Sequence, residues 1–244
     1  MRLITPLFLI LSLLSPGFVL LPGQHSYVQA ETKSAEEKKT VWRFDFCQIK
    51  NDRDLQAHGF SFEKDMDDKK KIHLRGTPNG LEIKALKPAF GLLAKKGLTV
   101  HNTDTIEVEW GVTAYPKGAD WHNTLNREAL MVYLFFGEPV DADKFYLPDS
   151  PYFIGMFLCE NEQTQVPYIG KNYKETGRYV CLEKPAAGKT IRSVFNFNQA
   201  YRQWFKTDRV PPITGIALEV DTTDLPEGTA AAVIKNISLK QTIN

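Results

Sequence analysis

The stretch Thr105-Ile106-Glu107-Val108-Glu109-Trp110-Gly111-Val112 alternates apolar with polar or small side chains. Successive side chains of a strand point to opposite faces, so this period of two predicts a β-strand with one buried face. The same pattern recurs outward along the chain, in the segments 42–47, 81–84 and 216–220. Alternation of this kind is typical of sheets that cover a core with one face only.

Two further segments, 130–136 and 153–158, are apolar at both strand parities. Such runs are expected for central strands that are covered on both faces. The segments 178–182 and 230–239 complete the set of predicted strands, although Lys235 interrupts the pattern of the last one. Many short strands without intervening helices indicate packed sheets rather than an α/β fold.

One segment follows a helical period instead. Its apolar positions are three and four residues apart, which places them on one face of a short helix; they are Phe197, Ala200, Tyr201, Trp204 and Phe205. Asn196 is suited to cap this helix, and Pro211 prevents its continuation. The sequence therefore predicts an all-β fold, an antiparallel β-sandwich of the jelly-roll (galactose-binding-like) type with one short helix near 196–206.

The first thirty residues have the order of a secretory signal. A positive charge at Arg2 precedes an apolar run, and Val28-Gln29-Ala30 places small residues where a signal peptidase cuts. We expect residues 1–30 to be a signal peptide, residues 31–40 a polar linker and residues 41–244 a single β-sandwich domain. The mature protein is then exported, to the periplasm or the extracellular space. An uncleaved membrane anchor is the alternative.

The charge of the mature chain offers no long-range attraction to polyanions. Without Arg2, its 29 acidic residues are matched by 29 basic ones, and the longest basic run is Lys69-Lys70-Lys71. Proteins that bind nucleic acid usually carry a strongly basic patch, so we expect no nucleic-acid partner. Membrane contact is expected only through an uncleaved signal segment, and the oligomeric state is left open.

Cys159 and Cys181 lie in two predicted strands, about equally far from the loop between them. The two side chains would face each other if these strands formed an antiparallel pair. A disulfide between them would stabilise the fold by about 3 kcal/mol through loop closure. Two buried free thiols are the alternative.

Several motifs between residues 90 and 239 keep a characteristic order and spacing. They are Ile106 to Trp110, Val132 to Phe136, Pro151 to Gly155, Tyr201 with Phe205, and Ile213 to Ala217 followed by Asp221-Thr222. In these motifs the chain resembles the bacterial family called domain of unknown function 3047, which implies an exported jelly roll of the carbohydrate-binding kind. The family usually carries an acidic pair and an arginine before its Val-Tyr strand, whereas this chain has Asn126-Arg127 and Met131 there. The resemblance thus implies a lost or altered site if those charges form the family's site.

Paired carboxylates offer the simplest route to catalysis. Glu107 and Glu109 share the polar face of one strand, and Glu160 and Glu162 lie near a strand end. Either pair could act as acid and base in glycoside hydrolysis. The solvent-exposed face of an ordinary strand has the same pattern, so the alternative is that these glutamates are surface residues without a catalytic role.

No metal-binding motif is evident. The histidines are scattered without ligand spacing, and Asp65-Met66-Asp67-Asp68 lacks the glycine and the closing glutamate of a calcium loop. We therefore expect no metal site and no cofactor. A structural calcium between the first and last strands is the one exception considered, and it would draw on Asp45 and Asn236.

The loop from Tyr115 to Asn123 joins two long strands and carries a tryptophan among polar residues. A flat indole suits the C–H face of a pyranose, and acid, imidazole and amide groups suit its hydroxyls. The predicted ligand-binding residues are Asp120, Trp121, His122 and Asn123, together with Asp221 and Asp224 after the strand 216–220. A Trp121 that packs under its own loop is the alternative.

These features favour an exported envelope protein that binds a glycan or another cell-envelope polymer without transforming it. A glycan-active hydrolase is one alternative, and a cleft that contains Glu160, Glu162, Asp221 or Asp224 would support it. A structural module whose loops bind a partner is the other. A shallow aromatic surface would favour binding over catalysis.

Overall fold

The computed structural model describes residues 37–123, 125–142 and 144–243, and every structural statement below concerns these residues. The described elements all belong to one compact unit, Glu36–Asn244. The predicted signal peptide, residues 1–30, lies outside the described residues. The predicted linker, residues 31–40, ends too late, because strand β1 already begins at Lys38. Among the described residues, no helix is long and apolar enough to span a membrane.

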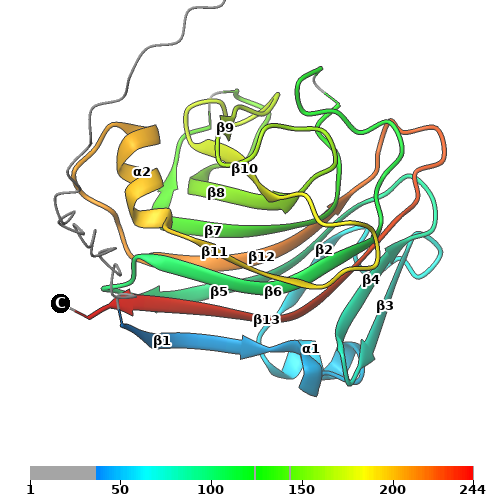
Figure 1. The fold of residues 1–244 in the computed structure, drawn as a ribbon. Helices are drawn as coiled ribbons and strands as arrows, with labels where there is room; N and C mark the ends of the chain where they lie inside the picture. The colour runs from blue at the N-terminus through cyan, green and yellow to red at the C-terminus, as the bar shows by residue number, and fades with distance from the viewer. Residues whose placement is uncertain (1–36, 124, 143, 244) are drawn as a thin grey trace, which may run out of the picture. The chain divides into compact units, whose positions relative to one another are not determined.

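Six strands form the first sheet, in the order β11-β6-β13-β4-β3, with β1 also paired to β13 (Figure 1). All of these pairs are antiparallel. The last strand is the centre of this sheet, because it pairs β6 on one side and both β1 and β4 on the other. The bounds are β1 Lys38–Asp45, β3 Ile72–Thr77, β4 Gly80–Ala85, β6 Thr105–Ala114, β11 Ile191–Phe195 and β13 Ala230–Thr242.

Seven strands form the second sheet, in the order β2-β5-β12-β7-β8-β10-β9. One pair in it, β8 with β10, is parallel, whereas the others are antiparallel. The parallel pair arises because residues 159–176 carry the chain back before β10 begins. The bounds are β2 Ser61–Lys64, β5 Phe90–Val100, β7 Glu128–Val140, β8 Ser150–Leu158, β9 Pro167–Tyr168, β10 Gly177–Glu183 and β12 Ile213–Asp221.

The inner faces of the two sheets enclose one apolar core. The alternation in the sequence places Val108 and Trp110 of β6 on this side, together with Phe136 of β7 and Leu218 of β12, and all four are buried. The indole Nε1 of Trp110 donates a 2.9 Å hydrogen bond to Ser193 Oγ, which pairs the polar atom of this large core side chain. The predicted β-sandwich is confirmed.

Two α-helices accompany the sheets, where the sequence analysis expected one. The expected helix is α2, Phe197–Phe205, whose N-cap Asn196 accepts a hydrogen bond from Gln199 N. The additional helix α1, Asp52–Ala57, follows a 3-10 turn at Phe46–Gln48. It buries only Leu55, so the sequence shows no apolar stripe there.

Candidate functional site

Aromatic and small residues alternate across the outer face of the seven-stranded sheet, the face that points away from the shared core. The strand register aligns Tyr133 with Ala217 on one side and Gly155 on the other. The row continues through Ala94 of β5 and Tyr179 of β10. The next row places Phe135 between Gly215 and Phe153. We call the rings Tyr133, Phe135, Phe153, Tyr173 and Tyr179 the outer aromatic face.

The rings fit on this face because glycine and alanine beside them leave room. A Cβ at Gly155 would meet Tyr133 Cε1 at 2.9 Å and Met131 Sδ at 2.4 Å. Tyr133 and Phe135 are stacked, with centroids 5.7 Å apart and planes 18° apart. The arrangement makes a second apolar cluster outside the sandwich core.

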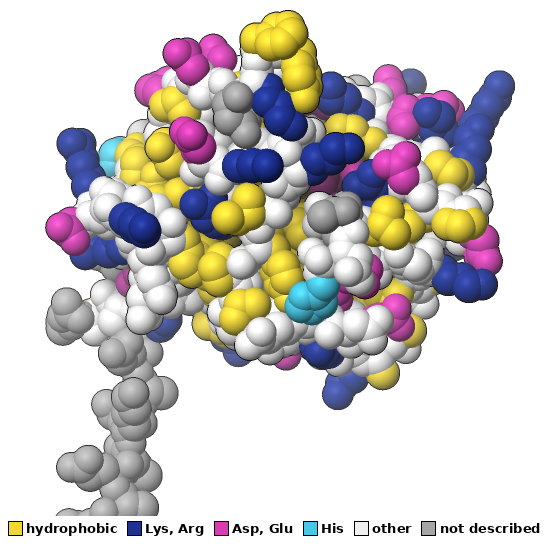
Figure 2. Space-filling view, turned by 90° about the horizontal axis from the view of Figure 1, so that it is seen from above, with side chains coloured by type: hydrophobic (Ala, Val, Ile, Leu, Met, Phe, Trp, Pro, Cys, Tyr) yellow, Lys and Arg dark blue, Asp and Glu magenta, His cyan; other side chains and the backbone are white. Residues whose placement is uncertain are grey.

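Two residues on this side of the sheet are partly exposed, Phe135 of β7 and Leu92 of β5. The small residues near them, Ala94, Gly215 and Ala217, are buried. Figure 2 views the molecule from above and shows hydrophobic side chains gathered in the middle, with charged side chains around them. The partly exposed ring of Phe135 is the aromatic side chain through which this face meets solvent.

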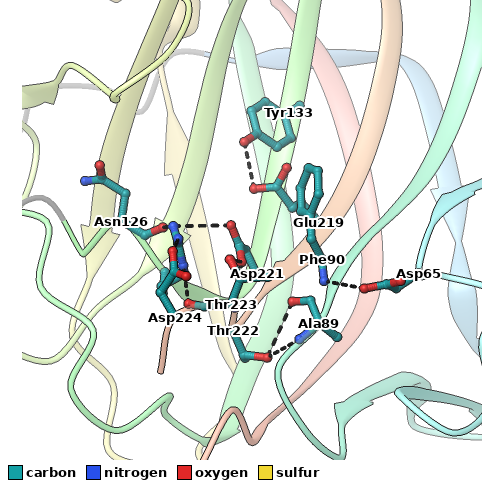
Figure 3. Close-up of polar contacts among 11 residues, drawn as sticks. Asp65, Ala89, Phe90, Asn126, Tyr133, Glu219, Asp221, Thr222, Thr223 and Asp224 are labelled. Atoms are coloured by element: carbon teal, nitrogen blue, oxygen red, sulfur yellow. Dashed lines mark hydrogen bonds and ion pairs between the residues drawn. The ribbon is translucent and has the colours of Figure 1, made fainter. Parts of the chain in front are cut away.

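Two glutamates meet beside Tyr133 on the same outer face. Glu219 of β12 accepts a 2.9 Å hydrogen bond from the hydroxyl of Tyr133, as Figure 3 shows. Glu128 begins the neighbouring strand β7, and its carboxyl is hydrogen-bonded to that of Glu219. Glu128 is 3% exposed and Glu219 is 8% exposed, so the pair is buried and Glu219 is nearer to solvent.

Burial changes the protonation of this pair. Desolvation raises the pKa of Glu219 to about 7 and outweighs the lowering by hydrogen bonds to Glu128 and Tyr133, while the charge of Asp221 adds to the increase. Desolvation also raises the pKa of Glu128 well above its usual value, and the charges of Glu219 and Asp221 raise it further. Glu128 therefore keeps its proton near neutral pH, whereas Glu219 loses its proton as the pH rises through about 7.

Arg127 brings together two of the predicted ligand-binding residues. Its guanidinium lies 3.4 Å from the carboxylate of Asp221 and 2.5 Å from that of Asp224. Its Nε also donates to the Thr223 carbonyl, which fixes the arginine against the loop after β12. Asp221 is partly buried and Asp224 is exposed, so an ion pair rather than an open pair of acids stands at this end of the face.

A cavity of about 20 Å³ adjoins Glu128, enough for one water molecule. Its lining includes Arg127, Glu128, Glu160 and Glu162. The second carboxyl oxygen of Glu128, Oε2, is fully buried and has no protein partner. Glu160 and Glu162 thus line one cavity. Asp221 and Asp224 do not line it, but both contact Arg127, which does.

The predicted loop site has a different geometry from the one expected. Trp121 is 6% exposed, and its ring lies 4.9 Å from Phe157 and 4.7 Å from Tyr179, centroid to centroid. The expectation of an open indole platform is therefore corrected, because the ring is buried against Phe157 and Tyr179. Asp120 accepts hydrogen bonds from the backbone of His122 and from both the backbone and side chain of Asn123. These polar groups close their own turn.

A disulfide joins Cys159 and Cys181, with Cα atoms 5.8 Å apart. The expected antiparallel pairing of their strands is wrong, because β8 and β10 run parallel. Both sulfurs lie in the outer apolar cluster with Trp121. Cys47 is the free cysteine.

The two residues considered for calcium lie opposite each other on neighbouring strands, but their side chains form hydrogen bonds with other residues. Asp45 lies opposite Asn236 in the pair of β1 with β13. Asp45 accepts from Cys47 N, and Asn236 donates to Glu109. Among the described residues, no cluster of three or more metal-ligating side chains is found.

The geometry of the acid pair differs from that of a glycoside hydrolase. The two carboxyls of such enzymes stand about 5–5.5 Å apart in retaining enzymes and about 6.5–9.5 Å apart in inverting ones. Glu128 and Glu219 share a hydrogen bond instead, which leaves no space for a glycosidic bond between them. The arrangement can hold a proton and accept a hydrogen bond from a ligand.

The sequence analysis missed the central residues of this site: Tyr133, Glu128 and Glu219. Glu219 has the appearance of a solvated residue on the polar face of strand 216–220. Glu128 directly precedes an apolar run. This run does not show which face of the strand Glu128 occupies, because the consecutive residues Ala129 and Leu130 are both buried in the core. The available signal was an ionisable pair, Arg127-Glu128, directly before an apolar strand.

No family model and no curated protein matches the chain. Among solved structures, the carbohydrate recognition domain of Emp46p in its potassium-bound form is similar at 12% identity over 82% of this chain and 96% of that one, with a TM-score of 0.42. The xylan-binding module CBM15 is similar at 10% identity over 86% of this chain and 100% of that one, with a TM-score of 0.35.

The xyloglucanase domain of NopAA, a type three effector from Sinorhizobium fredii, is similar at 9% identity over 82% of this chain and 99% of that one. Its TM-score is 0.41. At such identities the likeness concerns the fold alone. The resemblance to domain of unknown function 3047 stays a prediction.

Proposed function

We propose that this protein is exported and binds a glycan at the partly exposed Phe135 of the outer aromatic face, without cleaving it. The observation that carries the proposal is the partly exposed ring of Phe135, stacked on Tyr133 beside the small residues Gly215 and Ala217. Sugar rings pack their C–H faces on aromatic rings of this kind. The proposed site is on the sheet, whereas the sequence predicted a site on the loop of Trp121.

Polar groups at the edge of this surface supply the other half of sugar recognition. Glu219, which is 8% exposed and accepts from the Tyr133 hydroxyl, lies nearby on β12, and carboxylate oxygens accept hydrogen bonds from sugar hydroxyls. The disulfide Cys159–Cys181 is in keeping with an oxidising compartment outside the cytosol.

The test is a panel of neutral polysaccharides screened by affinity electrophoresis with the purified protein. The substitution Phe135→Ala should weaken binding tenfold to a hundredfold, since it removes the exposed stacking ring. Phe145→Ala is the matched control, because this ring is fully exposed on the loop after β7 and does not belong to the outer aromatic face. Equal binding by Phe135→Ala and the wild type would refute the proposed surface. A loss confined to Phe145→Ala would place the site on that loop instead.

A further inference from the structure

Three polar side chains lie on the outer face of the seven-stranded sheet, on the β2 side of the Phe135 ring. The register places Ser61 of β2 opposite Ala94 of β5. Glu63 and Lys96 follow two residues further along these strands. Residues two apart on a strand point to the same face, so all three share the face of Ala94, which belongs to the outer apolar cluster. We call Ser61, Glu63 and Lys96 the polar cluster.

Lys96 stands in the same row of the sheet as Phe135. The register aligns Lys96 with Gly215 of β12, and Gly215 with Phe135 of β7. Two strand spacings put the Cα atoms of Lys96 and Phe135 about 10 Å apart. The residue between them has no side chain, and a Cβ there would lie 3.5 Å from Phe135 Cδ2, so the ring borders the glycine. A ligand that packs on the ring therefore meets the lysine as the next side chain of this row.

The polar cluster is accessible to solvent, unlike the two acids on β7 and β12. The side chains of Lys96 and Glu63 are 74% and 32% exposed, and Ser61 is exposed as well. Glu219, in contrast, is 8% exposed. A ligand hydroxyl can therefore reach the polar cluster without a rearrangement of the sheet.

The polar cluster presents a donor and an acceptor side by side. Lys96 Nζ lies 2.8 Å from Glu63 Oε1, and Ser61 Oγ donates to the same oxygen at 3.1 Å. An ammonium has three donors and a carboxylate has two acceptor oxygens, so both groups keep capacity for a ligand. The hydrogen bond from Lys96 lowers the pKa of Glu63 and outweighs the effect of its partial burial, so this carboxylate is ionised near neutral pH. Sugar hydroxyls can accept from the ammonium and donate to the carboxylate.

On the basis of the proposed glycan binding, we propose that Lys96 and Glu63 bind hydroxyl groups of the glycan chain that packs on Phe135, and that Ser61 holds Glu63 in place. The site then needs free hydroxyls as well as sugar C–H faces. A glycan whose hydroxyls are O-methylated keeps those faces but has no proton to donate to Glu63. An exposed ion pair contributes little to stability, so substitution of either partner changes binding rather than folding.

The experiment compares unmodified and O-methylated polymers by affinity electrophoresis at pH 7. The probes are hydroxyethyl cellulose, dextran and mannan, each with its O-methylated form. We expect the wild type to bind one of the unmodified polymers about tenfold more tightly than its methylated form, as for loss of a hydrogen bond to a charged group. Lys96→Met and Glu63→Met keep the apolar stems, and each should weaken binding of the unmodified polymer by a similar factor.

Two further variants separate ligand contact from general effects of charge. Lys96→Arg keeps a cation with several donors and should retain most of the affinity. Arg75→Met is the matched control, because it removes an exposed cation from the Arg75–Glu82 pair of the other sheet and should leave binding unchanged. Thermal melts of the variants at the wild-type temperature show that weaker binding does not come from unfolding.

The outcomes distinguish this inference from the proposed function. Binding that depends on Phe135 but survives both Lys96→Met and Glu63→Met overturns the inference and leaves glycan binding in place. Equal binding of methylated and unmodified polymers, or an equal loss in Arg75→Met, also overturns it. No binding of any of these polymers by the wild type overturns both proposals.

Discussion

The two sheets use glutamates on their outer faces in opposite ways. On the six-stranded sheet, Glu109 receives a 2.9 Å contact from Lys235, and this contact lowers the pKa of its carboxyl. Burial would raise the pKa of Glu107, but hydrogen bonds from Arg192 and Lys240 outweigh it and hold the pKa below its usual value.

On the seven-stranded sheet, Glu128 and Glu219 have rings and another carboxyl as neighbours, and burial raises the pKa of both. All four residues are glutamates on β-strands, and in the sequence they look alike. The comparison shows that the neighbouring strands, rather than the residue itself, decide whether a strand glutamate is a surface ion or a buried acid. The predictions below test this difference.

The largest effect is expected from Trp121→Ala, which tests whether the outer aromatic face is packed like a core. Loss of the contacts with Phe157 and Tyr179 should lower the free energy of unfolding by roughly 3–5 kcal/mol, as for other buried large-to-small changes. Urea denaturation measures it. Phe145→Ala, whose ring is fully exposed, should leave stability unchanged. A Trp121→Ala variant as stable as the wild type would mean that the ring is not part of a packed layer.

The disulfide ties the same layer together, and Cys159→Ser should lower the free energy of unfolding by about 3 kcal/mol, since it releases a loop of 22 residues in the unfolded chain. Alkylation of the denatured, non-reduced protein should label one thiol, Cys47. Labelling of three thiols in protein purified from an oxidising compartment would contradict the bond.

The buried acids should make the protein less stable as the pH rises. A carboxyl with a raised folded-state pKa binds its proton more tightly in the folded state than in the unfolded state. The contribution of Glu219 to the free energy of unfolding is therefore fully present below about pH 4.5, its pKa in the unfolded chain. It is lost as the pH rises through about 7, its pKa in the folded protein. Asp221 adds an effect of the same sign, and Arg127, Tyr133 and Tyr179 are the other titratable groups that face the pair.

Urea denaturation at pH 5 and pH 8 should show a loss on the order of 2 kcal/mol at the higher pH. The double variant Glu128→Gln with Glu219→Gln should lose much less, and Glu82→Gln should behave as the wild type. A wild-type protein that becomes more stable between pH 5 and pH 8 would contradict the raised pKa values.

The smallest effect is expected on the six-stranded sheet. Glu107→Gln should cost roughly 1 kcal/mol or less, because its ion pairs with Arg192 and Lys240 are partly solvated. The cost should shrink further in 1 M NaCl, which screens such pairs. Chemical denaturation at low and high salt tests it, and a cost independent of salt would show that Glu107 acts by packing instead.

Much of the fold could be predicted from the sequence, because the spacing of apolar residues shows which side chains face the core. The alternation around Trp110 placed the strands, and the three-and-four spacing up to Phe205 placed helix α2. Helix α1 escaped because it buries one residue and leaves no period to detect. The parallel pairing of β8 with β10 escaped because local patterns say nothing about the direction in which a distant strand returns.

The candidate site is where tertiary structure decided the outcome. The sequence by itself determined that strand 216–220 has a polar face and that Glu219 lies on it. Only the packing of β12 beside β7 brought Glu128 and Tyr133 to that carboxylate. Only the fold of the loop after β6 covered Trp121 and left Phe135 partly open. The alternation of side chains along a strand is a local property of the backbone. Burial, strand pairing and pKa depend on residues far away in the chain, which come into contact only when the sheets assemble.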